Sequence, residues 1–260
     1  MEQALVDELA EFAGRLADES GPIIRKAHQG GFSTEAKADG SPVTNVDRAV
    51  EDRLRTIIAT SYPDHGIVGE ERGDKAANDG PVWVIDPIDG TLPFLAGIPV
   101  FGTLIALVED GMPLIGVIDM PATAERWLGC RGRPTTRNGA AVRVRACSGL
   151  ADALLSTSNP DFYGADDGDA FARLKAAVCW TVYGGSCLAY AQLASGRTDL
   201  GIDVALDPLD YLALVPVIEG AGGVVSDWQG APLTMASGNR ILAAGDARRH
   251  AEAMAILAAN

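Results

Sequence analysis

Residues 82–91, VWVIDPIDGT, join a continuous apolar run to a turn that carries two carboxylates. The first four residues are Val, Trp, Val and Ile, which are typical of a buried strand. Pro87 fixes its own φ and restricts the backbone of Asp86, so we expect the strand to stop at Asp86 and leave in a defined turn. The motif therefore predicts acidic groups at the end of a core strand.

The second half of this turn, residues 88–91, has features of an anion site. The spacing of three residues can bring the carboxylates of Asp86 and Asp89 to one side of the turn. Gly90 permits a close backbone approach, and Thr91 is a plausible helix N-cap. Free N–H groups at a helix N-terminus favour a phosphate. One short segment can thus hold a metal and bind the anion of a substrate.

Two other segments place carboxylates beside predicted core elements. Glu70 and Glu71 directly follow the apolar run at 66–69, and Asp207-Pro208-Leu209-Asp210 precedes an apolar helix. Mg²⁺ prefers oxygen ligands, and two such ions can activate water and neutralise phosphate charge. Each segment alone would be an ordinary turn or a solvated pair, because Asp-Pro and Asp-Gly are common turn dipeptides. Their combination predicts a magnesium-dependent phosphomonoesterase.

Helices and strands alternate along the chain, which predicts a layered α/β architecture rather than a bundle or a β-sandwich. An amphipathic helix begins near Leu5, and Gly21-Pro22 is expected to bend or interrupt it. Thr44 and Asp47 resemble a capping box for a second helix. Strands are expected at 66–69, 82–85, 100–108, 114–118, 126–130, 154–156, 198–204, 222–226 and 241–244, and further helices at 171–178, 187–194, 209–219 and 247–258.

No internal repeat or low-complexity linker divides the chain, so a domain boundary has to be inferred from the pattern of elements. The region Cys147-Ser148-Gly149 is the best place for a seam. We expect an N-terminal half at 1–147 with most of the metal ligands and a C-terminal half at 148–260 that completes the site. At this length the two halves can also form one large domain.

The composition disfavours several classes of partner. The 260 residues carry a formal net charge of −14, whereas nucleic acids and anionic membranes require clustered Lys and Arg. The 4 cysteines form no CxxC pair, which indicates reduced thiols. Neither a signal peptide nor a membrane-spanning run is visible, so we expect a cytoplasmic protein that acts on a small molecule.

Four stretches together resemble the inositol monophosphatase-like family of metal-dependent, lithium-sensitive phosphatases. They are KADGSPVTNVD at 37–47, GEE at 69–71, WVIDPIDGT at 83–91 and LDPLDYLALVPVIEGAGG at 206–223. The resemblance covers nearly the whole chain and implies an αβαβα layered sandwich of the sugar phosphatase type. It also implies a homodimer with two or three Mg²⁺ ions at the carboxylate cluster.

The same resemblance implies roles for individual residues. The implied metal ligands are Glu70, Asp86, the Ile88 carbonyl, Asp89 and Asp210, with Asp86 bridging two ions. Gly90 and Thr91 would contact phosphate through backbone N–H groups, with the Thr91 hydroxyl near the attacking water. Asp47 would pair with Thr91 and orient or deprotonate that water. Glu70 is the other candidate base.

Within the family the sequence most resembles histidinol-phosphate phosphatases of the plant and bacterial type, through GMPLIGVIDMP at 111–121 and ERWLGCRGRPTTRNG at 125–139. That resemblance implies release of phosphate from L-histidinol phosphate in histidine biosynthesis, with Asp203 at the substrate's ammonium group. Two departures bear on the substrate. Gly185 and Ser186 stand where an Asp is expected, and Leu92-Pro93 follow DPIDGT in place of a polar residue.

Other interpretations stay open at this point. The substrate can instead be inositol monophosphate or another sugar or polyol phosphate, whereas a bisphosphate would call for an added basic patch. A catalytically silent regulatory relative is disfavoured, because every matched side-chain ligand is acidic. A Ca²⁺-binding module would need a DxDxDG loop and a dinucleotide site a GxGxxG, and the sequence has neither.

Overall fold

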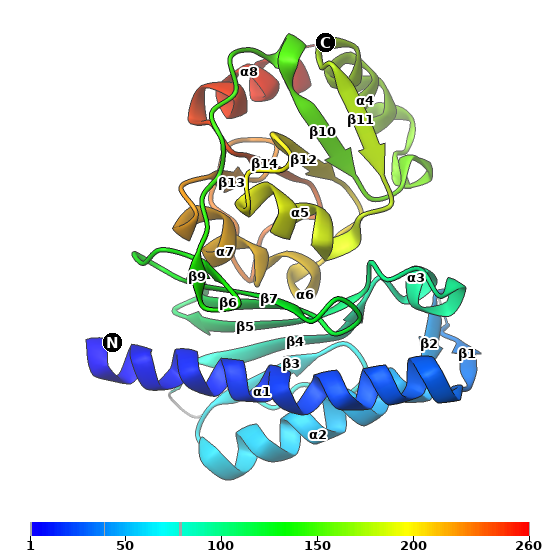
Figure 1. Ribbon diagram of the computed structural model, residues 1–260, viewed down its shortest axis with the longest axis vertical. Coiled ribbons are helices and arrows are strands. Elements are labelled where there is room, and N and C mark those ends of the chain that lie inside the picture. The colour runs from blue at the N-terminus through cyan, green and yellow to red at the C-terminus, as the bar shows by residue number, and fades with distance from the viewer. Residues whose placement is uncertain (1, 39, 78–79, 260) are drawn as a thin grey trace.

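A computed structural model of the protein describes residues 2–38, 40–77 and 80–259 (Figure 1). The helices are α1 (Gln3–Gly30), α2 (Asn45–Ser61), α3 (Thr91–Ala96), α4 (Ala165–Ala177), α5 (Ser186–Ala194), α6 (Pro208–Tyr211), α7 (Leu214–Gly220) and α8 (Ala247–Leu257), with 3-10 turns η1 (Leu150–Asp152) and η2 (Pro160–Phe162). The strands are β1 (Thr34–Ala36), β2 (Pro42–Thr44), β3 (Gly66–Gly69), β4 (Val82–Asp89), β5 (Gly102–Glu109), β6 (Met112–Met120), β7 (Glu125–Cys130), β8 (Thr136–Arg137), β9 (Ala140–Ala141), β10 (Leu154–Thr157), β11 (Trp180–Tyr183), β12 (Leu200–Asp203), β13 (Val224–Ser226) and β14 (Ile241–Ala244).

Two large sheets alternate with layers of helices (Figure 1). Helices α1 and α2 pack on one face of the sheet with strand order β3-β4-β5-β6-β7-β8-β9, and α5, α6 and α7 lie against its other face. The second sheet, with order β11-β10-β12-β14-β13, lies beyond these helices and is covered by α4 and α8. The predicted αβαβα sandwich is confirmed.

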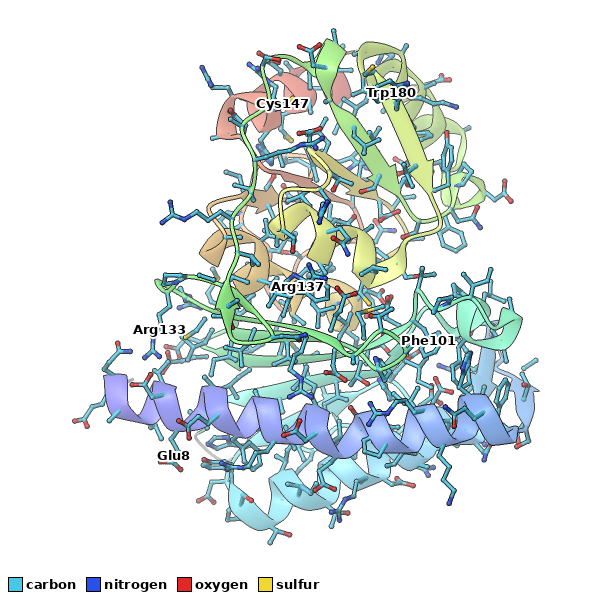
Figure 2. The ribbon with its side chains drawn as sticks, viewed as in Figure 1. Glu8, Phe101, Arg133, Arg137, Cys147 and Trp180 are labelled. Carbon is cyan, nitrogen blue, oxygen red and sulfur yellow. The ribbon has the colours of Figure 1, made fainter. Side chains whose placement is uncertain are left out.

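Apolar side chains fill the space between the layers. One core cluster joins α1 and α2 to the first sheet and includes Trp83. Another combines Trp127 of β7 with Tyr211 of α6, from opposite sides of the predicted seam. The segment that leads from β9 to β10 runs along the side of the molecule, with Cys147 towards its upper end (Figure 2). The halves 1–147 and 148–260 therefore share a core, and the boundary between them stays a prediction.

Helix α1 is continuous from Gln3 to Gly30, so the predicted interruption at Gly21-Pro22 is wrong. A proline inside a helix costs about 3 kcal/mol, because it lacks the N–H and crowds the preceding turn. The apolar face continues past it, and Leu16 and Ile24 are both fully buried in the core. Each such side chain contributes about 1.5–3 kcal/mol, so packing outweighs the proline. Neither α1 nor any other helix of the described ranges is long and apolar enough to cross a membrane.

The helix predicted at 209–219 is broken into α6 and α7. Pro216 lies in the first turn of α7 and lacks the N–H that would bond to the carbonyl of Leu212, so a continuous helix would lose this hydrogen bond at the point where α6 and α7 separate. The break lies directly against β6. A Cβ on Gly116 would be 2.0 Å from the carbonyl oxygen of Ala213, so only glycine allows this approach. The short α6 that results carries Asp210.

Candidate active site

Strand β4 carries the first two carboxylates, and it continues to Asp89 instead of stopping at Asp86 as predicted. On the neighbouring β5, Leu104 is opposite Asp86 and Gly102 is opposite Asp89. Three residue steps on β4 therefore match two steps on β5, which is a β-bulge. In a regular strand, residues three apart point to opposite faces. The one extra residue brings both carboxylates to the same face.

Contacts from β5 support this bulge. The hydroxyl of the fully buried Thr103 donates to the carbonyl of Pro87 at 2.9 Å. The N–H of Ile88 donates to Asp86 Oδ1 at 2.9 Å, which fixes that carboxylate against its own turn. A Cβ on Gly102 would lie 2.7 Å from a backbone oxygen of β6. Thr103 and Gly102 thus shape the site, although no sequence pattern had indicated them.

Gly90, and not Thr91 as predicted, is the N-cap of α3. Its φ of +83° lies in the left-handed region that favours glycine. A Cβ at this position would also lie 2.9 Å from Ser186 Oγ. Thr91 is the first residue of the helix, and its hydroxyl donates to the Ile88 carbonyl at 3.1 Å. Both residues therefore border the carboxylates, with Ser186 directly beside them.

Asp210 comes from the other half of the chain to join Asp86 and Asp89. Each of the three residues offers a carboxylate oxygen, and these oxygens lie within 4.8 Å of one another. The nearby Asp207 is the N-cap of α6, and its Oδ1 accepts the N–H of Leu209 at 2.7 Å. Asp210 in turn accepts the N–H of Asp207 at 2.8 Å. The two acids of this segment thus differ: Asp207 caps α6, and Asp210 reaches the cluster.

Burial raises the pKa of all three clustered carboxyl groups. The pKa of Asp86 lies well above its ordinary range, because burial and the charges of Glu70, Asp89 and Asp210 act in the same direction. Burial and the neighbouring Asp207 likewise raise the pKa of Asp210 well above its ordinary range. Such a group of carboxylates is unfavourable as three anions unless a cation neutralises it.

The donor set fits a hard divalent cation. Within the described residues the cluster consists of carboxylate oxygens, with neither sulfur nor imidazole among them. Mg²⁺ takes oxygen ligands in octahedral geometry, and proteins usually supply a few carboxylates while water and phosphate complete the shell. Asp86, Asp89 and Asp210 are therefore suited to hold such an ion.

Glu70 and Glu71 follow β3 and share one lysine. Lys37 Nζ lies 2.7 Å from Glu70 Oε1 and 2.6 Å from Glu71 Oε1. Burial lowers the pKa of Lys37, but the hydrogen bonds and charges of the two carboxylates outweigh it and raise that pKa. The charge of Glu70 also raises the pKa of Asp86, so the two carboxyl groups lie near each other. The structure therefore brings Glu70 to the edge of the cluster, between Lys37 and Asp86.

The segment at 70–72 depends on Glu51, a residue that no sequence pattern had indicated. Glu51 is fully buried on α2 and accepts the N–H groups of residues 71 and 72 at 2.7 and 3.1 Å. Arg55 Nε donates to the same carboxylate at 2.6 Å. An acidic residue within the apolar stripe of α2 is the feature of the sequence that could have revealed it.

Asp47 lies buried at the start of α2 and forms the predicted capping box with Thr44. Its Oδ2 accepts the N–H of Thr44 at 2.9 Å and the Thr44 hydroxyl at 2.5 Å. In the part of the chain that the structure describes, no hydrogen bond joins Asp47 to Thr91. The role of Asp47 at the attacking water stays a prediction.

Helix α5 brings residues of the second half to the same place. Gly185 precedes the helix, and Ser186 begins it with a φ of +45°, a conformation that costs energy for a residue with a side chain. The next N–H, from Cys187, donates to Asp89 Oδ2 at 2.6 Å and lowers the pKa of Asp89 against the effect of burial. Gly185 and Ser186 thus lie beside the carboxylates, together with an N–H that the sequence had not indicated.

Asp203 ends β12 and lies beneath the cluster. Its side chain is buried, and burial raises its pKa to about 6 against the opposing effect of its hydrogen bonds. It lines a small cavity together with Asp89, Ser186 and Asp210. The predicted contact of Asp203 with a substrate stays a prediction.

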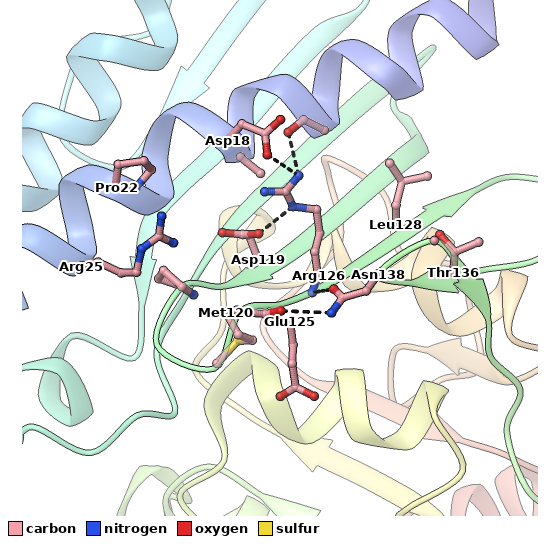
Figure 3. Close-up of a pocket in the computed structure, with 15 residues that line it drawn as sticks. Asp18, Pro22, Arg25, Asp119, Met120, Glu125, Arg126, Leu128, Thr136 and Asn138 are labelled. Atoms are coloured by element: carbon pink, nitrogen blue, oxygen red, sulfur yellow. Dashed lines mark hydrogen bonds and ion pairs between the residues drawn. The ribbon is translucent and has the colours of Figure 1, made fainter.

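A larger cavity of about 480 Å³ lies away from the carboxylates, between α1 and the ends of β6, β7 and β8 (Figure 3). Three of its charged groups are paired with one another. Arg126 lies 2.8 Å from Asp18 and 2.6 Å from Asp119, and it donates to the carbonyl of Gly14 at 3.0 Å. Because these groups satisfy each other, size alone does not make this cavity a candidate active site.

Comparisons with known proteins agree on the family to which this chain is similar. Residues 5–259 match the model of the inositol monophosphatase family. The Arabidopsis thaliana protein named bifunctional phosphatase IMPL2, chloroplastic, is 43% identical over 258 residues, which are 96% of this chain and 75% of that protein. A histidinol-phosphatase of Chlorobaculum parvum is 33% identical over 86% of this chain and 84% of its own length. A solved structure of an inositol monophosphatase from Zymomonas mobilis has a TM-score of 0.88 and 40% identity, and covers 96% of this chain and 98% of its own.

Proposed function

We propose that this chain, which belongs to the inositol monophosphatase family, is a Mg²⁺-dependent phosphatase that releases phosphate from L-histidinol phosphate. As a member of this family it is a phosphoric monoester hydrolase. The observation that carries the proposed chemistry is the group of three carboxylates, from two distant parts of the chain, whose oxygens lie within 4.8 Å of one another.

In this proposal Asp86, Asp89 and Asp210 hold Mg²⁺, with Glu70 and the Ile88 carbonyl as further ligands of two or three ions. When bound, Mg²⁺ supplies positive charge that neutralises the phosphate and makes water a better nucleophile. Asp86 suits a bridging position, because it lies buried among the charges of Glu70, Asp89 and Asp210. The raised pKa values in the cluster support this role, since they reflect negative charge that a cation would compensate.

The remaining roles concern phosphate and protons. Gly90 and Thr91 bind phosphate through their N–H groups, and the Thr91 hydroxyl is held in place by the Ile88 carbonyl. Glu70 is the proposed base, with Asp47 as the alternative. Burial raises the pKa of both carboxyl groups, and a base works best when its pKa approaches the working pH.

The likeness to a histidinol-phosphatase over 86% of the chain supports histidinol phosphate as the substrate. Gly185 and Ser186 are proposed substrate contacts, because Ser186 lies against Gly90 at the edge of the cluster. Leu92 follows the phosphate-binding residues directly and is 59% exposed, so it adds an apolar surface where the family has a polar residue.

A panel assay tests the substrate and the metal together. We expect kcat/KM for histidinol phosphate to exceed that for inositol 1-phosphate and adenosine 3′,5′-bisphosphate by at least about tenfold, and EDTA to abolish all release. A preference for another member of the panel would remove the histidinol assignment but leave the class. Full activity in EDTA would contradict the metal site.

Inositol monophosphate is the second candidate substrate. The 40% identity to the inositol monophosphatase from Zymomonas mobilis favours it. So does Ser186, since a hydroxyl beside Gly90 can bond to a substrate hydroxyl, whereas the expected Asp would have favoured an ammonium group. The same panel separates the two candidates.

We also propose that the protein is a homodimer. Strand β11 is the edge of the second sheet, and its side chains Trp180, Val182 and Tyr183 are 69%, 48% and 41% exposed. Trp180 stands at the outside of the molecule (Figure 2). Exposed edge strands with large apolar side chains favour association, and a second copy would cover this one. The cytoplasmic location, the lithium sensitivity and the place in histidine biosynthesis stay predictions.

A further inference from the structure

We propose that Asp203 is a positioning residue that holds helix α5, and through it Asp89. This role rests on the proposed function, because Asp89 matters as part of the phosphatase site.

The carboxylate of Asp203 is already occupied by protein donors. Oδ1 accepts the Thr157 hydroxyl at 3.0 Å and the Ser158 N–H at 2.7 Å. Oδ2 accepts the Ser158 hydroxyl at 3.1 Å and the Tyr190 hydroxyl at 2.7 Å. An ionised carboxylate has about four acceptor positions, so these four bonds fill it. A substrate ammonium group would have to displace one of them.

The space around Asp203 is small. The side chain is only 2% exposed, at the buried end of β12. The cavity that it lines with Asp89, Ser186 and Asp210 has a volume of about 10 Å³. That is room for a single water molecule.

The hydrogen bonds of Asp203 continue the second sheet beyond its backbone pairing. Strands β10 and β12 pair at Leu155 with Leu200 and at Ser156 with Gly201. Beyond these pairs, the side chain of Asp203 joins the two strands, because it accepts hydrogen bonds from residues 157 and 158 at the end of β10. It ties together elements that would otherwise separate just beneath the site.

The bond to Tyr190 extends this connection to the carboxylate cluster. Tyr190 is buried in the second turn of α5, and Cys187 in the first turn donates its N–H to Asp89 at 2.6 Å. A helix transmits a displacement of one turn to the next, because its backbone hydrogen bonds are continuous. The Tyr190–Asp203 bond therefore sets the position of the N–H that orients Asp89.

Tyr163 offers a matched control within the same network. Its hydroxyl lies 2.9 Å from Thr157 Oγ1 and donates to the Ile202 carbonyl at 3.0 Å. Tyr163→Phe and Tyr190→Phe therefore each remove one hydroxyl from this network, but only Tyr190 belongs to α5. A purely structural effect would be similar in both variants.

Mg²⁺ binding, measured by calorimetry with the metal alone, is the first readout. We expect Tyr190→Phe and Asp203→Asn to weaken Mg²⁺ affinity about 10-fold or more, as loss of an outer-shell contact does, and Tyr163→Phe to leave it within about 2-fold. The second readout is kinetic. Tyr190→Phe should lower kcat by a similar factor for every substrate of the panel, without changing the ratio of their KM values.

Two results would overturn the proposal. One is a Tyr190→Phe variant with wild-type Mg²⁺ affinity and kcat, and this variant decides the matter even where Asp203→Asn does not fold. The other is an Asp203→Asn variant that raises KM for histidinol phosphate alone, with Mg²⁺ affinity unchanged. Because Mg²⁺ binding needs no substrate, it tests Asp203 even where the wild-type protein hydrolyses no member of the panel and the proposed function fails.

Discussion

Asp86 lies buried among Glu70, Asp89 and Asp210, so its charge is unfavourable without a cation. We expect Asp86→Asn to reduce phosphate release by more than about 100-fold, because a ligand matters more than its outer-shell partners. The rise in Tm on adding Mg²⁺ should also disappear.

The pKa of Asp86 is raised, so the metal-free wild type loses stability as the pH rises through that pKa. Above that pKa, in EDTA, the Asn variant should therefore be at least as stable as the wild type.

Asp207→Asn is the control for this experiment. It removes one negative charge from the segment that carries Asp210, but Asn caps a helix as well as Asp does. Steady-state rates and thermal unfolding with Mg²⁺ or EDTA compare the two variants. Near-normal Mg²⁺-dependent release by Asp86→Asn, or equal losses in both variants, would contradict the proposed site.

At the scale of the elements, the site depends on the close approach of β5 and β6 beside the bulge in β4. Gly102→Ala would place a Cβ 2.7 Å from the backbone oxygen of Asp119, so the strands must separate opposite Asp89. We expect a loss of about 1–3 kcal/mol in the free energy of unfolding, as for other overpacked core positions, together with lower activity. Urea denaturation measures the first effect and the phosphate assay the second.

Gly14→Ala should have the opposite effect and raise the free energy of unfolding. Gly14 lies inside α1, and a Cβ there would meet no atom within 4 Å. Alanine is a better helix former than glycine by about 0.5–1 kcal/mol, so this variant should be more stable by that amount. Destabilisation of both variants to the same extent would show that the approach of β5 and β6 is not the cause.

At the scale of the whole molecule, the exposed edge of β11 predicts assembly. We expect light scattering to give a mass twice the 27.1 kDa of one chain. Trp180→Glu should reduce it to that of one chain with unchanged circular dichroism, because it places charges in the contact of two edge strands. Leu5→Glu is the control, since Leu5 is 41% exposed on α1, on the opposite side of the sandwich. A wild-type mass of 27.1 kDa would refute the dimer.

Short-range patterns in the sequence were enough to predict the layered α/β class and the acidic residues of the site. Apolar runs alternate with amphipathic stretches along the chain. This pattern indicates strands and helices, because the positions of an element that are buried carry apolar side chains at its own period. The VWVIDPIDGT segment likewise contains its own strand, turn and carboxylates. Strand β11 was missed although Trp, Thr, Val and Tyr favour strands. Its side chains are mostly exposed at the edge of the sheet, so its sequence does not show the alternation of buried and exposed residues that marks other strands.

By itself, the sequence determined most of the elements and which side chains can bind a metal, because both follow from neighbouring residues. Only the tertiary structure decided which way those side chains face. The bulge that aligns Asp86 with Asp89 exists through pairing with β5, and the continuity of α1 past Pro22 comes from packing on the sheet. The inward position of Asp203 likewise depends on Thr157, Ser158 and Tyr190. These contacts join residues far apart in the chain, whose meeting depends on the whole fold and leaves no local pattern to read.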